Sequence, residues 1–415
     1  MNDTASDASN EDIQGAVTRI RKLIDHSTTN NEGSRFTYLI GNNGVGKSRI
    51  LAELARQYDM DQETLIRTIP CITDSIYDKF AFGKRSMRIR YFGARNAANA
   101  VFQSAIERAL AMHILNGIVE KNRFVSRLEK FIGMKLELRV AGAHRLDDER
   151  KTRLDKLMLE NLIDRRKLKT SDFRSKISKE EEQIIKELLF TRILPSKLTK
   201  LQAGALRSFI ELNPDIYVLV TKPGRIQAFP FGELSSGEKS RTLFAAKLLV
   251  AADHHSLILI DEPENSLHLH WQLTFHEALV DMLSGIRNFH VVVATHSPII
   301  VSQSAKPDTP DTEVLVLDDD GKAHDKVQFS LVLGSQIDSY DEVLLDFFDT
   351  ATFQTKSIKE KVADVMVHVA DDPSKVDARK EELERLLEKK GLDNENRKLV
   401  KSAISLLEKH FRASA

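Results

Sequence analysis

The residues with the clearest chemistry form one glycine-rich segment, Gly41-Asn42-Asn43-Gly44-Val45-Gly46-Lys47-Ser48. Glycines at these positions let a backbone wrap around a chain of phosphate groups and direct its N–H groups at them. Lys47 can neutralise the charge of the β- and γ-phosphates, and Ser48 offers a hydroxyl group to Mg²⁺. The run Phe36–Ile40 before the segment predicts a buried strand, and residues 47–58 after it predict a helix. We therefore predict a phosphate-binding loop that ends at the positive N-terminus of a helix.

Two carboxylates, Asp261 and Glu262, directly follow the apolar run Leu257–Ile260. The run is short and β-rich, so it predicts a buried strand whose carboxyl end carries both side chains. Ligands of open α/β sheets bind at that edge. We assign Asp261 to the Mg²⁺ site together with Ser48, and Glu262 to activation of the attacking water as a general base. The alternative is a strand that ends in a solvated acidic turn.

Two further segments are candidates for contact with the same phosphate-bearing ligand. Ser235, Ser236, Gly237 and Glu238 lie just ahead of a predicted helix. They can cap that helix, and its N-terminus can also serve as a second phosphate site. A predicted strand over 290–294 runs into Thr-His-Ser-Pro. His296 is then a candidate sensor of the γ-phosphate, with an ordinary structural histidine as the alternative.

The order of these four motifs resembles the head of an ABC-class ATPase. The segment Leu234–Glu238 (LSSGE) is similar to the family signature LSGGQ and departs from it at the third and fifth positions. The resemblance implies that two ATP molecules are held between two heads in a head-to-tail dimer. Ser236 and Gly237 would then contact the ATP of the second subunit, and His296 would be the switch histidine. Residues 266–268 would fill the loop that crosses the dimer interface.

The glutamine of the family's Q-loop has one main candidate, Gln103, which lies downstream of a predicted strand over 87–92. The alternative is a glutamine on a helix surface. The aromatic residue that stacks on adenine in transporter heads is not visible, because Phe36 and Tyr38 alternate with core positions of the strand before the loop.

The segment Asp261–His268 (DEPENSLH) resembles the DEPE-x-x-LH variant of soluble ABC-class ATPases. That group includes overcoming-lysogenization-defect nucleases, RecF-type and SMC-like repair proteins, and the ATPases of bacterial anti-phage systems. In size and layout the chain is most similar to the Septu-system ATPase, which partners an HNH-type nuclease. The resemblance implies an ATP- and Mg²⁺-dependent sensor or regulator that controls a separate nuclease or toxin effector. The alternatives are a repair ATPase that acts directly on DNA and the ATPase subunit of a transporter.

The predicted elements place all four motifs in one α/β unit. Short apolar strands alternate with helices, while residues 144–189 are dense in both charge signs with Leu and Ile at helical spacing. Polar residues 1–14 predict a frayed tail, and Asp318–Gly321 predicts a hairpin turn. We expect an α/β fold, an ABC-type P-loop ATPase head with a helical insertion and a helical C-terminal region. The expected divisions are a tail and helix over 1–30, the head over 31–134 and 205–335, the insertion over 135–204, and the C-terminal region over 336–415.

The amino-acid composition limits the class of protein, its cellular location and its possible partners. The 415 residues include 61 Lys and Arg, 61 Asp and Glu, and one Cys, Cys71. Zero net charge argues against a protein that coats DNA, although basic stretches over 84–95 and 192–207 leave a local DNA contact open. A single Cys excludes a disulfide scaffold and fits a cytoplasmic protein. No apolar run reaches about 18 residues without a charge, so we expect no contact with a membrane. The expected assembly is a homodimer or a higher homo-oligomer.

Overall fold

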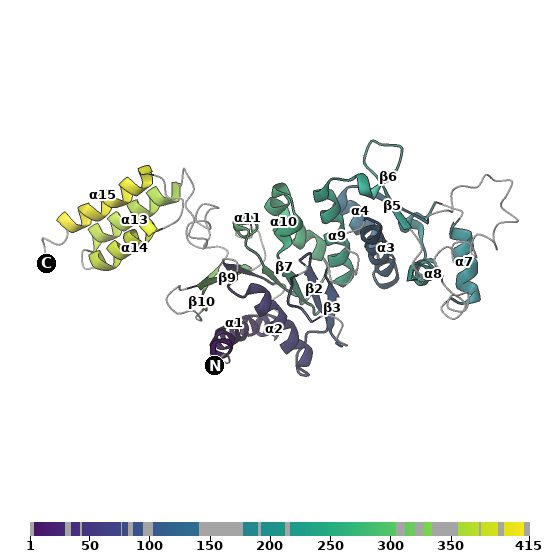
Figure 1. Cartoon of the computed structure of the whole chain (residues 1–415), viewed down its shortest axis with the longest axis horizontal. Coiled ribbons are helices and arrows are strands. Elements are labelled where there is room, and N and C mark those ends of the chain that lie inside the picture. The colour runs from purple at the N-terminus through teal and green to yellow at the C-terminus, as the bar shows by residue number, and fades with distance from the viewer. Residues whose placement is uncertain are drawn as a thin grey trace.

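A seven-stranded sheet forms the centre of the chain, with strand order β10-β9-β1-β8-β7-β2-β3 (Figure 1). All neighbouring strands are parallel except the antiparallel pair β9 and β10. The strands are β1 (Arg35–Gly41), β2 (Ile69–Thr73), β3 (Ile89–Phe92), β7 (Leu257–Asp261), β8 (His290–Ala294), β9 (Thr312–Asp319) and β10 (Val327–Leu333). The computed structural model describes residues 4–29, 35–41, 44–75, 77–81, 86–93, 103–140, 177–189, 192–211, 216–303, 312–319, 327–333, 356–372, 375–388 and 394–410.

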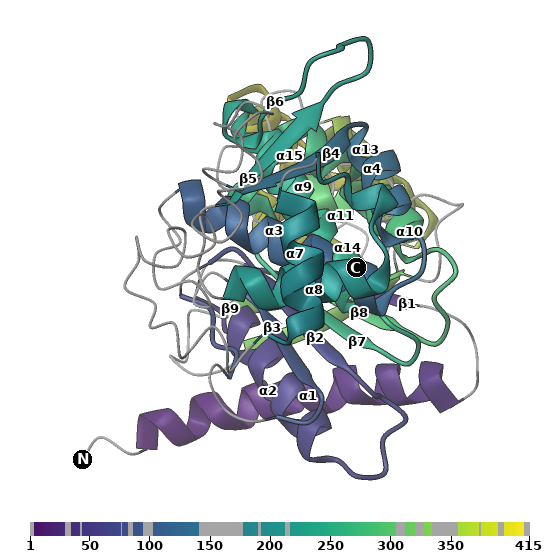
Figure 2. The ribbon, with the colours of Figure 1, turned by 90° about the vertical axis from the view of Figure 1, so that its right-hand side faces the viewer.

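Helices cover both faces of this sheet because its central strands are apolar on both sides. In β1, Phe36, Tyr38 and Ile40 belong to one buried cluster, while Leu39 belongs to the other. Helices α1 (Thr4–Thr29) and α2 (Lys47–Met60) pack on the second face, as the lower part of Figure 2 shows. The first face is covered by α9 (Ser236–Ala251) and α10 (Leu269–Leu283), and α3 (Gln103–Glu120) and α4 (Phe124–Ile132) extend that layer. The α/β prediction with a parallel sheet is confirmed.

A second, three-stranded antiparallel sheet stands beside the helical layer. It contains β4 (Lys135–Val140), β5 (Ile216–Thr221) and β6 (Phe229–Pro230), in that order. Near it lie α7 (Lys179–Leu189), the short 3-10 turn η3 (Pro195–Lys197) and α8 (Lys200–Glu211). Residues 135–140 therefore form a strand rather than the start of a helical insertion. Every residue of β4 pairs with one of β5, and apolar and polar side chains alternate along it. The division of the chain at residues 135 and 204 stays a prediction, and residues 141–176 lie outside the described residues.

The C-terminal region is helical, as predicted. Helices α13 (Lys356–Asp371), α14 (Val376–Glu388) and α15 (Asn394–His410) pack around a core of their own that includes Ile358, Leu383 and Leu407 (Figure 1). The remaining elements are α11 (Pro298–Ser302) and the 3-10 turns η4 (Phe231–Glu233) and η5 (Pro263–Ser266). Among the helices that the structure describes, none is long and apolar enough to cross a membrane.

Several arginines of the basic stretches noted in the sequence make internal contacts. The Arg88 guanidinium donates to the backbone oxygens of Tyr58 (2.8 Å) and Asp61 (2.6 Å), at the C-terminal end of α2. Arg90 lies 3.6 Å from Glu120. In the second stretch, Arg192 pairs with the buried Glu137 at 2.6 Å. A DNA contact through these stretches remains a prediction, and Lys84, Arg85 and Arg95 lie outside the described residues.

Replacement of Tyr38 by phenylalanine is expected to lower the free energy of unfolding by about 1–3 kcal/mol. The Tyr38 hydroxyl lies 2.7 Å from His276 Nδ1, and both side chains are fully buried. The substitution keeps the ring but removes one hydrogen bond from a buried imidazole. Urea unfolding of the full chain measures the loss, with Tyr77→Phe as the control because Tyr77 is 78% exposed. Equal unfolding midpoints for the Tyr38 variant and the unaltered protein would contradict this prediction.

Candidate functional site

Three loops that carry predicted site residues leave the same edge of the central sheet. Strands β1 and β7 flank β8, and both run parallel to it. Ala294, the last residue of β8, aligns with Leu39 of β1 and with Asp261 of β7. The segments after these strands hold the glycine-rich loop, the two carboxylates and His296. Because carboxyl ends of parallel strands form the ligand-binding edge of such sheets, this placement makes one site of three distant motifs.

Backbone geometry explains the glycines of the first loop. Gly44 and Gly46 have φ angles of 91° and 97°, in a region that residues with a Cβ atom rarely adopt. At Gly41, where φ is 147°, a Cβ atom would lie only 2.3 Å from the backbone oxygen of Leu317 in β9. Val45 is buried in the core beneath the loop. The loop is therefore shaped by glycine and anchored by one apolar side chain.

Lys47 is the first residue of α2, and its side chain folds back over the loop. Its Nζ atom donates to the backbone oxygen of Gly41 at 2.8 Å, and the residue is 5% exposed. Burial lowers the pKa of Lys47, while attraction to Glu262, Glu264 and Asp261 acts in the opposite direction. A buried cation that faces carboxylates at a helix N-terminus is well placed to receive phosphate oxygens.

Ser48 and Asp261 form the candidate Mg²⁺ site. The Ser48 hydroxyl donates to Asp261 Oδ1 at 3.0 Å, so two loops from different strands meet there. Asp261 is 1% exposed, and burial raises its pKa to about 7. Hydroxyl and carboxylate oxygens are ligands that Mg²⁺ prefers, and few protein ligands are usual when phosphates complete its sphere. The donor set therefore fits the ion.

Glu262 has a strained backbone and a partly exposed side chain. Its φ and ψ angles are 49° and 56°, in the left-handed region that non-glycine residues seldom occupy. Its backbone N–H donates to the Ala294 oxygen at 2.9 Å, and its Oε2 atom accepts from the Asn265 side chain at 2.7 Å. Strain of this kind is typical of residues whose orientation serves a site. Unlike the buried Asp261, Glu262 therefore keeps a partly exposed carboxylate at this sheet edge.

His296 has a partner that the sequence motifs left unassigned. Its Nδ1 atom lies 2.7 Å from Glu264 Oε1, and its backbone N–H donates to the same carboxylate at 2.6 Å. Glu264 is only 8% exposed. The pairing with Glu264 raises the pKa of His296 above its ordinary value, although partial burial opposes this. Glu264 is visible in the sequence as the last residue of the Asp-Glu-Pro-Glu segment. Its pairing with His296 could be found only once β7 and β8 were known to be neighbours.

The Ser235–Glu238 segment begins helix α9. Ser235 is the N-cap: its hydroxyl accepts from the Glu238 backbone N–H at 3.3 Å, and the Glu238 carboxylate accepts from the Ser235 backbone N–H at 3.1 Å. A Cβ atom on Gly237 would lie 2.5 Å from the ring of His268. Glu238 also pairs with Lys222 at 2.6 Å. These contacts confirm the helix cap, and they connect the segment to Lys222, which follows β5, and to His268, which precedes α10.

The nucleotide contacts of all the predicted site residues stay predictions, and three of these residues add nothing to the geometry above. Gln103 is the first residue of α3, and its role stays a prediction. Asn42 and Asn43 lie outside the described residues.

Replacement of Glu264 by glutamine is expected to lower the pKa of His296, because the largest cause of its upward shift is removed while partial burial still disfavours the charged imidazole. In the unaltered protein, protonated His296 stabilises the fold fully below about pH 6.5, and this contribution disappears as pH rises through its raised folded-state pKa. The glutamine variant should lose that pH dependence. Titration of the imidazole by NMR measures the shift, with Glu233→Gln as the control. An unchanged His296 pKa would show that Glu264 is not responsible.

The sheet, the glycine-rich loop and the carboxylates at the strand ends define an ABC/AAA-type P-loop ATPase domain. Residues 217–302, about a fifth of the chain, match the family model described as "AAA domain, putative AbiEii toxin, Type IV TA system". This stretch holds the LSSGE, Asp-Glu-Pro and Thr-His-Ser segments but not the glycine-rich loop. No curated protein matches the chain.

One solved structure similar to the chain is the Smc head domain with a coiled coil and joint derived from Pyrococcus yayanosii. The two sequences are 12% identical, and the match covers 83% of this chain and 66% of that chain with a TM-score of 0.22. Because this score is low, the fold class rests on the strand order and the loops described above.

Proposed function

We propose that this chain binds and hydrolyses ATP with Mg²⁺ and dimerises around the nucleotide. The observation that carries the proposal is the meeting of Lys47, Ser48, Asp261, Glu262 and His296 at one sheet edge. Backbone N–H groups of the loop and Lys47 would bind the phosphates, and Ser48 and Asp261 would hold Mg²⁺. When bound, the ion neutralises phosphate charge. Glu262 would accept the proton of the attacking water, and His296, held by Glu264, would contact the γ-phosphate.

The place of the signature segment supports the proposed dimer. Ser236 is exposed at the start of α9, and the contacts of Gly237 and Glu238 lead to His268 and Lys222. If this segment caps a phosphate, as in the ABC class that the sequence resembles, the P-loop of a second chain would supply that phosphate. Two heads placed head to tail would complete two such sites.

We further propose that ATP occupancy regulates a separate nuclease or toxin effector in anti-phage defence. The description of the matched family names a toxin and a TA system, and the DEPE-x-x-LH segment is of the soluble type. The alternative is an SMC/RecF-like repair ATPase that acts directly on DNA.

Purification of the tagged chain from its own host distinguishes these functions. The proposal predicts a nuclease or toxin at fixed stoichiometry in native mass spectra, with an effector activity that changes when ATP is added. A chain that instead purifies without an effector and binds DNA in a salt-sensitive way would support the repair function.

A further inference from the structure

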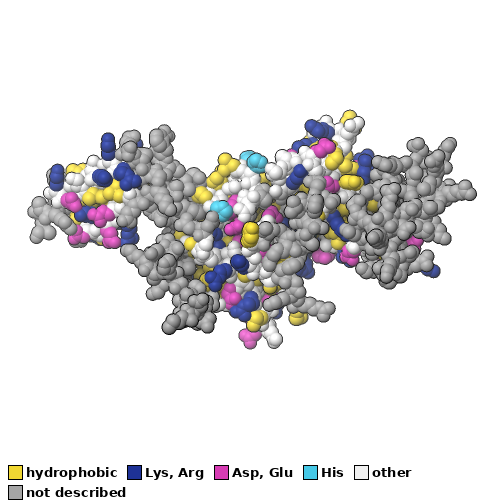
Figure 3. Space-filling view, viewed as in Figure 1, with side chains coloured by type: hydrophobic (Ala, Val, Ile, Leu, Met, Phe, Trp, Pro, Cys, Tyr) yellow, Lys and Arg dark blue, Asp and Glu magenta, His cyan; other side chains and the backbone are white. Residues whose placement is uncertain are grey.

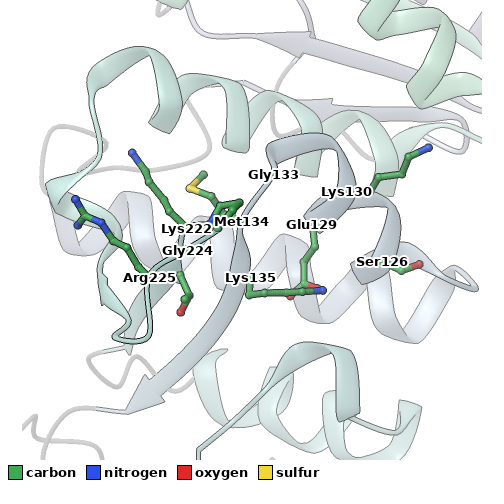
Figure 4. A pocket seen from close by; sticks show the side chains of 11 residues that line it. Ser126, Glu129, Lys130, Gly133, Met134, Lys135, Lys222, Gly224 and Arg225 are labelled. Atoms are coloured by element: carbon green, nitrogen blue, oxygen red, sulfur yellow. The ribbon is translucent and has the colours of Figure 1, made fainter.

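A hollow near α9, the helix that begins with the signature segment, is lined by several cationic side chains. It is open to solvent, has a volume of about 500 Å³ and lies between α4 and the hairpin that joins β5 to β6 (Figure 4). Four cationic residues and one carboxylate belong to its wall: Lys130, Lys135, Lys222, Arg225 and Glu129. The hairpin projects from the molecule, and Lys and Arg side chains gather around it at the upper right of Figure 3. None of these residues takes part in the ATP site described above.

The charges in the hollow do not cancel. Glu129 Oε2 pairs with Lys135 at 2.8 Å, and its Oε1 atom accepts from the Leu136 backbone N–H at 3.0 Å, so this carboxylate is fully engaged. Within the described part of the chain, Lys130 and Arg225 have no carboxylate partner. The hollow therefore keeps a positive charge that an anionic ligand would neutralise.

A tight turn fixes the two cations of the hairpin. The Arg225 backbone N–H donates to the Lys222 oxygen at 3.1 Å, and Pro223 and Gly224, with φ of 77° at Gly224, occupy the central positions as in a type II turn. Lys222 Nζ and Arg225 Cζ lie 5.8 Å and 5.4 Å from the centroid of the same Phe229 ring. Two like charges held over one ring repel each other, and an anion bound between them would relieve that repulsion.

We propose that this hollow binds a phosphate-bearing ligand on Lys222 and Arg225, whose side chains extend to the same side in Figure 4. Phosphate suits a guanidinium fork beside an ammonium group, and the volume suits a ligand of nucleotide size. The phosphate can belong to a small polyphosphate compound or to a nucleic-acid strand. Both sources present the same chemistry to the hollow.

Occupancy of the hollow is coupled to the signature segment through Lys222. Its Nζ atom lies 2.6 Å from Glu238 Oε1, and the other oxygen of that carboxylate accepts from the Ser235 backbone N–H and hydroxyl at 3.1 Å and 2.9 Å. A phosphate in the hollow competes with Glu238 for Lys222 and so loosens the link between the hairpin and the helix cap. This coupling is reciprocal by thermodynamic linkage, and its effect on ATP turnover rests on the proposed function.

Calorimetry of the full chain with sodium tripolyphosphate tests the binding. Two sites are expected, the P-loop and the hollow. Lys47→Ala should remove the first, and the double variant Lys222→Ala/Arg225→Ala should weaken the second at least about tenfold, since each lost charge-assisted bond contributes at this scale. The matched control, Lys197→Ala/Lys200→Ala, removes two exposed lysines, one from η3 and one from the start of α8, and should leave both sites intact.

The outcomes separate the two proposals. A hollow site that persists unchanged in Lys222→Ala/Arg225→Ala overturns the phosphate site. If the Lys47→Ala variant still binds tripolyphosphate at two sites, the assignment of the P-loop to ATP is contradicted, but the proposal for the hollow is unaffected. Fluorescence anisotropy with a short oligothymidylate then shows whether the bound phosphate belongs to a nucleic-acid strand or to a small compound. Binding that depends on Lys222 and Arg225 indicates a nucleic-acid strand, whereas tripolyphosphate binding alone indicates a small ligand.

The coupling has its own test, which requires no ATP turnover. In the Lys47→Ala background, Glu238→Gln removes the competitor of the ligand for Lys222. Tripolyphosphate affinity of the hollow should then rise about twofold to fivefold, as expected for release of a partly exposed ion pair. Unchanged or weaker affinity would overturn the coupling.

Discussion

Replacement of Lys47 by alanine is expected to abolish measurable ATP binding at the P-loop. The ammonium group is buried, lies 2.8 Å from the Gly41 oxygen and faces three carboxylates. Its loss removes charge-assisted hydrogen bonds to the phosphates and leaves those carboxylates to repel them. The expected cost is about 3 kcal/mol or more, which corresponds to affinity weakened roughly a hundredfold or more.

Calorimetry with ATP and Mg²⁺ measures this effect. The control is Lys22→Ala, which removes an exposed lysine from α1 and should leave the affinity unchanged. Near-normal affinity in the Lys47 variant, with an unchanged unfolding midpoint, would refute the assignment of the loop to phosphate binding.

Replacement of Glu262 by glutamine is expected to slow hydrolysis about a hundredfold or more while ATP still binds. Glutamine has nearly the same shape and keeps an oxygen that can accept from Asn265, whose side chain now lies 2.7 Å from Glu262 Oε2. It cannot accept the proton of the attacking water. The nucleotide therefore remains between the two heads, and the dimer accumulates.

Phosphate release and size-exclusion chromatography with light scattering, both with ATP, measure the two halves of this prediction. Glu63→Gln, an exposed change on the loop after α2, should behave as the unaltered protein. A Glu262 variant that hydrolyses ATP at the normal rate would remove Glu262 from the catalytic role. One that stays at its nucleotide-free mass would count against the ATP-bound dimer.

Much of the central sheet could be predicted because its strands are short, apolar and followed by distinctive loops. The runs at 36–40, 257–260 and 290–294 became β1, β7 and β8, and the glycine-rich loop fell between strand and helix as expected. Parallel neighbours then bring their carboxyl ends together, which is why motifs more than two hundred residues apart share one site.

Other elements depended on contacts that one sequence does not display. Strand β4 has a clear alternation of Leu136, Leu138 and Val140 with charged residues, but it lies next to a charged helical segment, so its pairing with β5 was missed. Strand β10 pairs only with β9 at the sheet edge and was not predicted. Helix α1 begins at Thr4, within the stretch predicted to fray.

At the site, the unpredicted partnership was that of Glu264 with His296. Both residues were visible in motifs, but their meeting requires β7 and β8 to be adjacent. The contacts of the basic residues could not be predicted either, because they also depend on which elements are neighbours in the fold. Arg88 was considered for nucleic acid, yet it donates to the carbonyl oxygens at the end of α2, which no local pattern indicates.

In the proposed dimer, each ATP site combines the P-loop of one chain with the signature segment of another. Mixing two inactive variants tests it most directly: Lys47→Ala, which lacks a working P-loop, and Ser236→Arg, which blocks the exposed start of α9. A mixed dimer of the proposed kind holds one intact site, so an equal mixture should regain roughly a quarter of the unaltered ATPase activity, because half of the dimers are mixed. If the mixture stays as inactive as each variant alone, although both variants fold and exchange subunits, the composite site is contradicted.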